Sequence, residues 1–304
     1  MYDIAETAEV THHYVDRGRE RNIALRNERE KMNRVLILSG KVASEHNMTE
    51  MNRDLKLMLE ATGEFQIRAT EEFNGATERT LEGYDMILLN YDGKDKPTDR
   101  YQTLEPGAEK VFFDFVRKGG GLYIHHSSCW LEDGLPEEYY KLWGYYLTMP
   151  YSRKVPQDDF CVHPVGNDPI VRGLSRQILA PGDDFFAGIQ KCSGTEPEVV
   201  LAAFDDINAY RVPGWPPKHH PVDIPDGKLE HMRGVNTDTP IAWKHRYGKG
   251  RVFGCSIGHG IDTYHRFDYI TMFVRACQWC CGKEVTLNKP DRTGENRFRP
   301  WPYY

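Results

Sequence analysis

The stretch Arg34-Val-Leu-Ile-Leu-Ser39 is a short apolar run that ends at Gly40. Apolar residues at successive positions over this length are typical of a strand that is buried on both faces, as in a parallel sheet. The same pattern returns at Tyr84-Asp-Met-Ile-Leu-Leu-Asn90 and at Leu122-Tyr-Ile-His-His126. These three runs predict the centre of an α/β sheet.

Segments of helical periodicity separate these strands. A first helix is predicted behind a Thr49 cap and ends at Gly63, with apolar residues at Met51, Leu55, Met58 and Leu59, and a further strand follows at 65–69. A second helix is predicted before the Gly119 run, with an apolar stripe formed by Ala108, Val111, Phe112, Phe115 and Val116. Strand, helix, strand, helix, strand indicates a parallel sheet with right-handed crossovers. Later strands are expected at 198–204, 240–245 and 251–257, and a last helix at 268–281.

The sequence predicts one domain, with an N-terminal arm and a C-terminal tail. Residues 1–33 are polar and charged and predict an N-terminal arm, and residues 34–283 form the α/β domain. Within that domain, residues 205–233 are rich in Pro, Gly and His and predict an irregular surface excursion. The tail, 284–304, carries aromatic residues that we expect to pack on this subunit or on a neighbour. The arm and the tail are therefore candidate contacts of a homo-oligomer.

The composition excludes several classes of function. With 39 Lys and Arg against 45 Asp and Glu, the net charge is −6, so nucleic acid and anionic membranes are not expected partners. The sequence has no apolar stretch long enough to span a membrane. It also has no secretory signal, which predicts a location in the reducing cytoplasm. Its seven cysteines are an odd number and do not indicate a disulfide framework. Neither G-x-G-x-x-G nor a phosphate-binding loop motif occurs. A small neutral molecule such as a sugar is the expected ligand.

Histidines follow three of the predicted strands. His46 comes after the first, His125 and His126 end the third, and His259 follows the strand at 251–257. Ligands of open α/β sheets bind outside the carboxyl ends of the strands, where these side chains converge. Imidazole is the commonest zinc ligand, and a catalytic site takes about three protein ligands, so the pattern predicts a divalent metal ion, with zinc as the first candidate. Since neighbouring residues of a strand point to opposite faces, only one of His125 and His126 can face the site.

Other polar residues near the strand ends are weaker candidates. Asp92 follows the strand at 84–90, and Asp183 and Asp184 follow a Pro-Gly turn that can bring a carboxylate to the same edge. The segment 127–129, Ser-Ser-Cys, occupies the place of a nucleophile elbow, but no G-x-S-x-G or G-x-C-x-G motif supports one.

Three further segments resemble a known family. Gly248-Lys-Gly-Arg-Val-Phe253, Gly258-His-Gly-Ile-Asp-Thr-Tyr264 and Phe273-Val-Arg-Ala-Cys-Gln-Trp279 resemble, in this order, blocks of the ThuA-like (trehalose utilisation) family. The resemblance implies a flavodoxin-like layered α/β fold with a mostly parallel sheet. That fold is similar to class I glutamine amidotransferases but lacks their cysteine nucleophile. It also implies a role in sugar metabolism, beside dehydrogenases that make 3-keto-glycosides.

The family's site residues carry over position by position. Its loop histidines match His46, His126 and His259, and its acidic block matches Asp183 or Asp184. The chain departs from the family at Asp168, where a histidine is usual, at Cys280 and Cys281, where alanines are usual, and in the long excursion.

Together these observations predict a metal-dependent enzyme that acts on an oxidised sugar, such as a 3-keto-glycoside, by hydrolysis, elimination or isomerisation. The predicted metal ligands, which would let the ion polarise a carbonyl, are His46, His126, His259 and Asp184. The predicted proton-transfer groups are His125, Asp262 and His265, and the predicted substrate contacts are Asp92, Trp130 and Tyr264. Two rival hypotheses are a non-catalytic sugar-binding or regulatory partner of a sugar dehydrogenase, and an amidohydrolase that uses Cys129.

Overall fold

The structure is a computed structural model, and it describes residues 32–40, 46–91, 94–95, 100–101, 104–218 and 220–285. The predicted N-terminal arm and C-terminal tail lie almost wholly outside these ranges, as do Asp92 and His219. Within the described ranges, no helix is long and apolar enough to cross a membrane.

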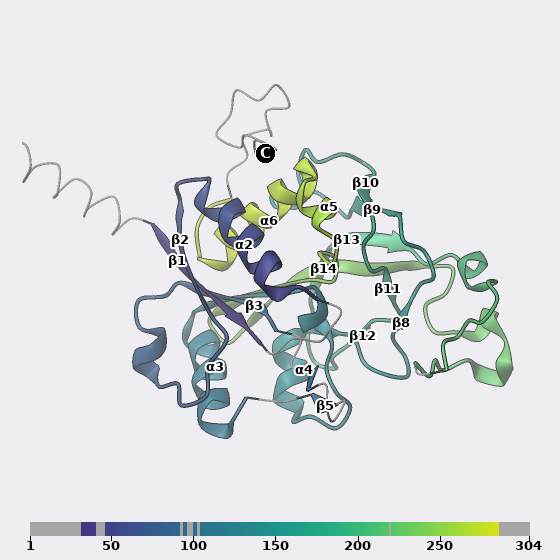
Figure 1. Cartoon of the computed structure of the whole chain (residues 1–304), viewed down its shortest axis with the longest axis horizontal. Helices are drawn as coiled ribbons and strands as arrows, with labels where there is room; N and C mark the ends of the chain where they lie inside the picture. The colour runs from purple at the N-terminus through teal and green to yellow at the C-terminus, as the bar shows by residue number, and fades with distance from the viewer. Residues whose placement is uncertain are drawn as a thin grey trace, which may run out of the picture.

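A nine-stranded sheet forms the centre of the molecule, with the strand order β10-β9-β13-β14-β15-β6-β3-β1-β2 (Figure 1). In chain order the strands of this sheet are β1 (Asn33–Ser39), β2 (Phe65–Thr70), β3 (Met86–Asn90), β6 (Gly121–His125), β9 (Phe160–Pro164), β10 (Ile178–Ala180), β13 (Glu198–Phe204), β14 (Asp238–Tyr247) and β15 (Gly250–Cys255). Three two-residue pairs lie outside it: β4 (Lys94–Asp95) with β5 (Arg100–Tyr101), β7 (Tyr145–Tyr146) with β12 (Gln190–Lys191), and β8 (Arg153–Lys154) with β11 (Phe186–Ala187).

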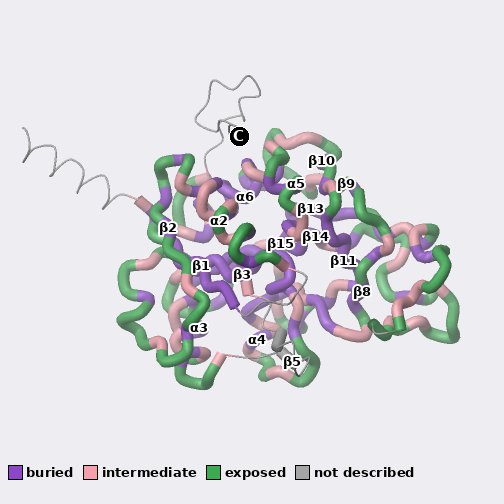
Figure 2. Tube along the Cα trace, in the orientation of Figure 1, coloured by how far each residue is buried: buried purple, intermediate pink, exposed green. Residues whose placement is uncertain are grey.

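Helices cover both faces of the sheet. Their bounds are α2 (Met48–Glu60), α3 (Pro106–Lys118), α4 (Glu137–Trp143), α5 (Ile261–Tyr264) and α6 (Phe267–Cys280). Helices α2 and α6 pack on one face, and α3 and α4 pack on the other (Figure 1). Alternate residues of β1 enter the two cores: Val35 and Ile37 join the first, and Leu36 and Leu38 the second. Figure 2 accordingly shows buried chain at the centre and exposed chain around it.

Half of the sheet is parallel, as the sequence predicts. Strands β2, β1, β3, β6 and β15 are all parallel neighbours. Every residue of β3 and β6 is buried, which explains their unbroken apolar runs. The predicted fold class, a layered α/β fold with a mostly parallel sheet, is confirmed.

The other half of the sheet is antiparallel. The turn at Gly248 and Lys249 joins β14 to β15 as a hairpin, and β13, β9 and β10 continue the antiparallel pairing. Gly248 has a φ of +58°, a conformation that glycine adopts without a steric cost. Because β13 runs opposite to β14, and β10 runs opposite to β9, both share the direction of the five parallel strands, so seven of the nine strands point the same way.

Some local predictions need correction. The cap of α2 is Asn47, not Thr49, because the Asn47 side chain accepts a hydrogen bond from the Glu50 N–H at 3.3 Å. In α3, Phe113 is buried where the predicted stripe has Phe115, since the Phe113 ring packs against Tyr139 of α4 with centroids 4.9 Å apart.

The predicted excursion is irregular, as expected. It contains three short 3-10 turns, at Ile207–Tyr210, Pro225–Gly227 and Leu229–His231. The buried Arg153 of β8 binds it through the Asp205 carboxylate and the Arg233 carbonyl oxygen, the latter at 3.0 Å. The excursion is therefore anchored to the domain at both ends.

Candidate metal centre

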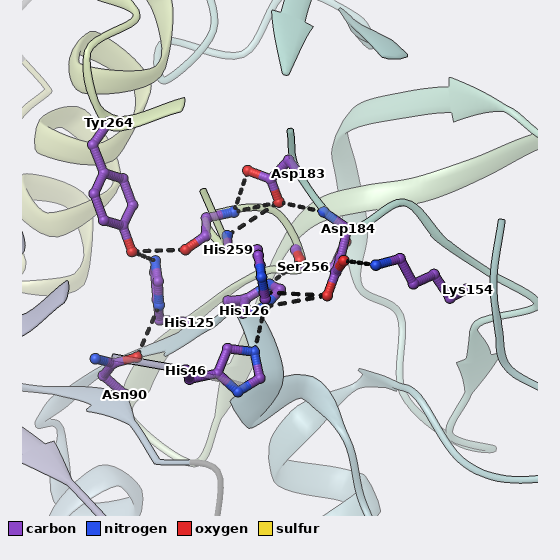
Figure 3. A network of polar contacts seen from close by, with 11 residues as sticks. His46, Asn90, His125, His126, Lys154, Asp183, Asp184, Ser256, His259 and Tyr264 are labelled. Atoms are coloured by element: carbon purple, nitrogen blue, oxygen red, sulfur yellow. Dashed lines mark hydrogen bonds and ion pairs between the residues drawn. The ribbon is translucent and has the colours of Figure 1, made fainter. Parts of the chain in front are cut away.

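Four side chains converge at the carboxyl edge of the parallel strands (Figure 3). His46 lies just before α2, His126 follows β6, and His259 follows β15, while Asp184 lies in the loop between β10 and β11. One ligand atom of each lies within 4.8 Å of the other three. The structure therefore brings together all four residues that the sequence analysis nominates as metal ligands.

His126 is at the centre of this cluster. Its Nε2 atom lies 3.1 Å from His46 Nε2 and 3.2 Å from His259 Nδ1. Its Nδ1 atom lies 2.8 Å from the Ser256 carbonyl oxygen, which can only accept a hydrogen bond. Nδ1 must therefore carry the proton, and the lone pair of Nε2 faces the other imidazoles. Burial, reinforced by His46, lowers the pKa of His126 well below its usual value, so the ring is held in the neutral form that binds metals.

The spacing of the nitrogen atoms fits a tetrahedral ion. Zinc–nitrogen bonds of about 2.0 to 2.1 Å place neighbouring ligand atoms of a tetrahedron about 3.3 to 3.4 Å apart. The two nitrogen pairs that involve His126 are 3.1 and 3.2 Å apart, and the three ring centroids lie 4.9 to 5.2 Å from one another. Three imidazoles and a carboxylate are also a donor set that suits zinc and related transition metals. The residues present fit the predicted ion.

Asp184 completes the donor set. Its Oδ2 atom lies 3.2 Å from His259 Nδ1 and 3.9 Å from His126 Nε2. Its Oδ1 atom pairs with the ammonium group of Lys154, whose strand residue lies opposite Phe186 in the β8–β11 pair. The two carboxylate oxygens thus have different partners, and only Oδ2 faces the imidazoles.

The backbone at His126 makes a sharp turn. Its φ of +46° lies in the left-handed region, which is unfavourable for a residue with a side chain and is found mostly at functional sites. The sequence has no motif for a tight turn at residues 127–129, and the structure places a sharp turn one residue earlier, at His126. The turn presents the His126 side chain at the carboxyl end of β6.

The structure argues against Cys129 as a nucleophile. The thiol is fully buried, and burial raises its pKa well above the usual value. A reactive cysteine needs the opposite shift, because the thiolate is the nucleophile.

His125 points to the other side of the strand, as the alternation predicts. Its Nδ1 atom lies 3.1 Å from Asn90 Oδ1, and its Nε2 atom lies 3.2 Å from the Tyr269 hydroxyl. Burial lowers the pKa of His125 to about 3. Both ring nitrogens are therefore engaged in a buried network. The part of His125 in proton transfer stays a prediction.

Gly258 passes directly over His125. A Cβ atom at Gly258 would lie 2.5 Å from His125 Nε2, and its φ of +123° also favours glycine. The Tyr264 hydroxyl donates to the Gly258 carbonyl oxygen at 2.7 Å and lies 3.3 Å from His125 Nε2. Tyr264, a predicted substrate contact, is buried here and braces the loop that carries His259.

The remaining predicted residues lie at varying depth. Trp130 is half-buried, and its ring packs on Phe186, which in turn packs on His126 with centroids 5.8 Å apart. Asp262 and His265 are exposed on and just after α5, and Asp92 lies outside the described residues. These roles in proton transfer and substrate binding stay predictions.

Several residues of the site carry no recognisable sequence signal. Lys154 lies on a two-residue strand, Ser256 contributes a backbone carbonyl, and Asn90 is the last residue of an apolar strand. Asp183 appears in the sequence analysis only as an alternative to Asp184, and the structure separates the two. Asp183 accepts hydrogen bonds from backbone N–H groups and is not one of the four cluster residues (Figure 3).

Comparisons with known proteins agree with this architecture. The family model described as ThuA, trehalose utilisation, matches residues 34–280. A ThuA-like protein from Parabacteroides merdae is similar in structure, with a TM-score of 0.61 and 16% identity over 84% of this chain and 92% of that one. A ThuA-like protein from Bacteroides uniformis has a TM-score of 0.57 and 16% identity over 82% of this chain and 91% of that one.

The curated proteins contain no match to the chain. At 16% identity the two solved structures establish only the shared fold. The family match covers most of the chain and includes all four cluster residues, and it confirms the resemblance seen in the sequence. The chain belongs to the ThuA family of trehalose utilisation.

Proposed function

We propose that this protein is a metal-dependent enzyme of carbohydrate metabolism whose substrate is an oxidised sugar such as a 3-keto-glycoside. The observation that carries the proposal is the convergence of three imidazoles and one carboxylate from four separate loops, with ligand atoms within 4.8 Å of one another. Chains that merely bind a neutral sugar have no need of such a donor set. The family's association with sugar utilisation supports the choice of substrate class.

A divalent ion, with zinc as our first choice, would act as a Lewis acid on a carbonyl and its neighbouring hydroxyl and would acidify the adjacent C–H bond. The ring of His126 is fixed for this task by its hydrogen bond to Ser256, and Asp184 supplies the negative charge. Hydrolysis, elimination and isomerisation of a keto-sugar share this requirement for a polarised carbonyl.

The surroundings of the cluster suit a sugar. The Phe186 ring packs against His126, and the half-buried Trp130 packs against Phe186, which offers an apolar surface beside the polar ligands. The Lys154 side chain is 54% exposed, so its ammonium group can donate to a substrate hydroxyl as well as to Asp184. We assign proton transfer to Asp262 or His265, which are exposed on and just after α5.

The test has two stages. The purified protein should contain about one equivalent of divalent metal, and a His126→Ala, His259→Ala double variant should contain none. Incubation with a 3-keto-disaccharide and with the ordinary disaccharide should then show consumption of the keto form by the parent protein only. The absence of bound metal in the parent would refute the proposal.

The rival hypothesis predicts a different result in the second stage. A non-catalytic sugar-binding protein would leave both disaccharides unchanged, and its melting temperature would rise in their presence. A parent protein that binds metal but only shifts its melting temperature would therefore favour a regulatory partner of a dehydrogenase.

A further inference from the structure

Asp183 is a buried acid directly beside a candidate metal ligand. Only 1% of its surface is exposed, and its carboxylate faces the backbone of the loop that carries His259 (Figure 3). An isolated carboxylate is costly to bury, so its partners must compensate for the lost water. Those partners are backbone N–H groups.

Three N–H groups from two distant loops bind the Asp183 carboxylate. Its Oδ1 atom accepts from Asp184 at 2.9 Å, from Gly258 at 3.1 Å and from His259 at 3.1 Å. Its Oδ2 atom lies 3.0 Å from the Gly258 nitrogen. Two of these three donors belong to cluster residues, Asp184 and His259.

The carboxylate therefore joins two segments that are 75 residues apart in the sequence. One segment is the turn that precedes β11, and the other is the loop that follows β15. The ligand atoms that these segments carry, Asp184 Oδ2 and His259 Nδ1, are 3.2 Å apart. A small shift of either loop would change this distance, because each loop is irregular and has no ladder of strand hydrogen bonds at that point.

The hydrogen bonds of Asp183 hold the backbone of two candidate metal ligands, Asp184 and His259. Groups that orient metal ligands in this way typically contribute a factor of about 10 to 100 to metal affinity.

We propose that Asp183 is a positioning residue that fixes His259 and Asp184 in the geometry of metal ligands before the ion binds. The inference rests on the proposed metal site. It assigns the two neighbouring acids different tasks: Asp184 contacts the ion, and Asp183 holds the backbone of two ligands without contacting it.

The experiment compares Asp183→Asn and Asp183→Ala with Asp168→Asn as a matched control. Asp168 is another buried acid, which accepts the Ile170 N–H at 2.9 Å and pairs with Lys244. Zinc affinity would be measured by competition with a chelator, and the ligand geometry by the visible absorption of the cobalt-substituted protein. Exchange of the Gly258 and His259 amide protons would be measured by NMR in metal-free protein.

The alanine variant should bind zinc about 10- to 100-fold more weakly, with altered cobalt absorption bands and amide exchange at Gly258 and His259 at least about 10-fold faster. The asparagine variant, which keeps one acceptor oxygen and the size of the side chain, should show the same changes to a smaller degree. The control should lose melting temperature but keep its zinc affinity, cobalt spectrum and amide exchange at the site. If the alanine variant does not fold, the asparagine variant decides.

The outcomes separate this inference from the function it rests on. If the parent protein binds zinc and both Asp183 variants match its affinity, spectrum and amide exchange, the inference is wrong and the metal site stands. If the parent binds no metal, the proposed function and the inference are both refuted. Equal losses of affinity in the Asp168 control would also overturn the inference, because they would show a general effect of lost stability.

Discussion

The two halves of the central sheet contribute to the candidate metal centre in different ways. The parallel half supplies His126 directly after β6, His259 four residues after β15, and His46 seven residues after β1. The antiparallel half and its loops supply Asp184 and its partner Lys154. The histidines therefore lie where any parallel α/β sheet places its ligands. Asp184 reaches the same edge of the sheet from the irregular loop between β10 and β11.

The two halves hold the site by different kinds of contact. Strands β1, β3, β6 and β15 of the parallel half are largely buried on both faces and fix the histidines through the hydrophobic core. In the antiparallel half, buried polar contacts of Arg153 and Asp183 fix the loops instead. Polar anchors of this kind are sensitive to the loss of a single partner.

The strongest test of that contrast is Arg153→Met. Arg153 is almost fully buried, and it binds the Asp205 carboxylate and the Tyr210 hydroxyl, the latter at 2.9 Å. Its loss leaves the Asp205 carboxylate buried without a counter-charge, with the Tyr210 hydroxyl as a remaining hydrogen-bond donor, so the free energy of unfolding should fall by about 3 to 5 kcal/mol. Urea denaturation measures this change. The double variant Arg153→Met, Asp205→Leu should recover much of the loss, and a single variant within 1 kcal/mol of the parent would contradict the account.

The second test removes a ligand from the parallel half. In His126→Ala, the central nitrogen of the cluster is lost. If four ligands share a binding free energy of about 10 to 16 kcal/mol, one ligand accounts for about 2.5 to 4 kcal/mol, which corresponds to about 100- to 1000-fold in affinity. Chelator competition measures the loss. His245→Ala is the matched control, because His245 is a buried histidine that contacts the Leu142 carbonyl oxygen, and its zinc affinity should remain that of the parent.

The third test removes the ligand of the antiparallel half. Asp184→Asn keeps an oxygen atom but loses the charge, and we expect zinc affinity to fall by about 10- to 100-fold. The effect should be smaller than that of His126→Ala, because the neutral amide oxygen can still bind and part of the Asp184 side chain is open to water. The control is Asp226→Asn, an exposed acid of the excursion that pairs with His231. A larger loss in Asp184→Asn than in His126→Ala would reverse the proposed ranking of the two halves.

The fourth test uses pH and His125, the buried histidine at the end of β6. The pKa of His125 is lowered to about 3 by burial, whereas an unfolded chain has about 6.5. Between pH 3 and pH 6.5 the folded state therefore binds fewer protons than the unfolded state. The stability that is present above pH 6.5 is lost as the pH falls through this range. The loss is about 1.4 kcal/mol per pH unit for one such group.

Urea denaturation of the metal-free protein measures this effect. The fall in the free energy of unfolding between pH 6.5 and 5 should be about 2 kcal/mol smaller in His125→Gln than in the parent. Equal falls in the two proteins would show that His125 is not held neutral by burial.

Much of the parallel half could be predicted from the sequence. The unbroken apolar runs that become β1, β3 and β6 are buried on both faces, and this is the strongest local signal of a parallel strand. Because strand ends in such a sheet share one edge, the positions of His46, His126 and His259 followed from topology alone. The alternation of side chains also predicted that His125 and His126 would separate.

The antiparallel half could not be predicted to the same depth. Strands β8 and β11 are two residues long, and β10 is three, so their sequences have no detectable periodicity. The contact between Lys154 and Asp184 depends on the pairing of β8 with β11, which local sequence does not encode. The distinction between Asp183 and Asp184 likewise depends on which carboxylate meets the loop at Gly258, 75 residues away.

We propose that His46, His126, His259 and Asp184 together hold one divalent ion. Anomalous diffraction from crystals of the zinc-loaded protein, recorded on both sides of the zinc absorption edge, tests it most directly. The account predicts one strong anomalous peak about 2.0 to 2.2 Å from His46 Nε2, His126 Nε2, His259 Nδ1 and Asp184 Oδ2. No peak among these four side chains, or a peak bound by other residues, would contradict it.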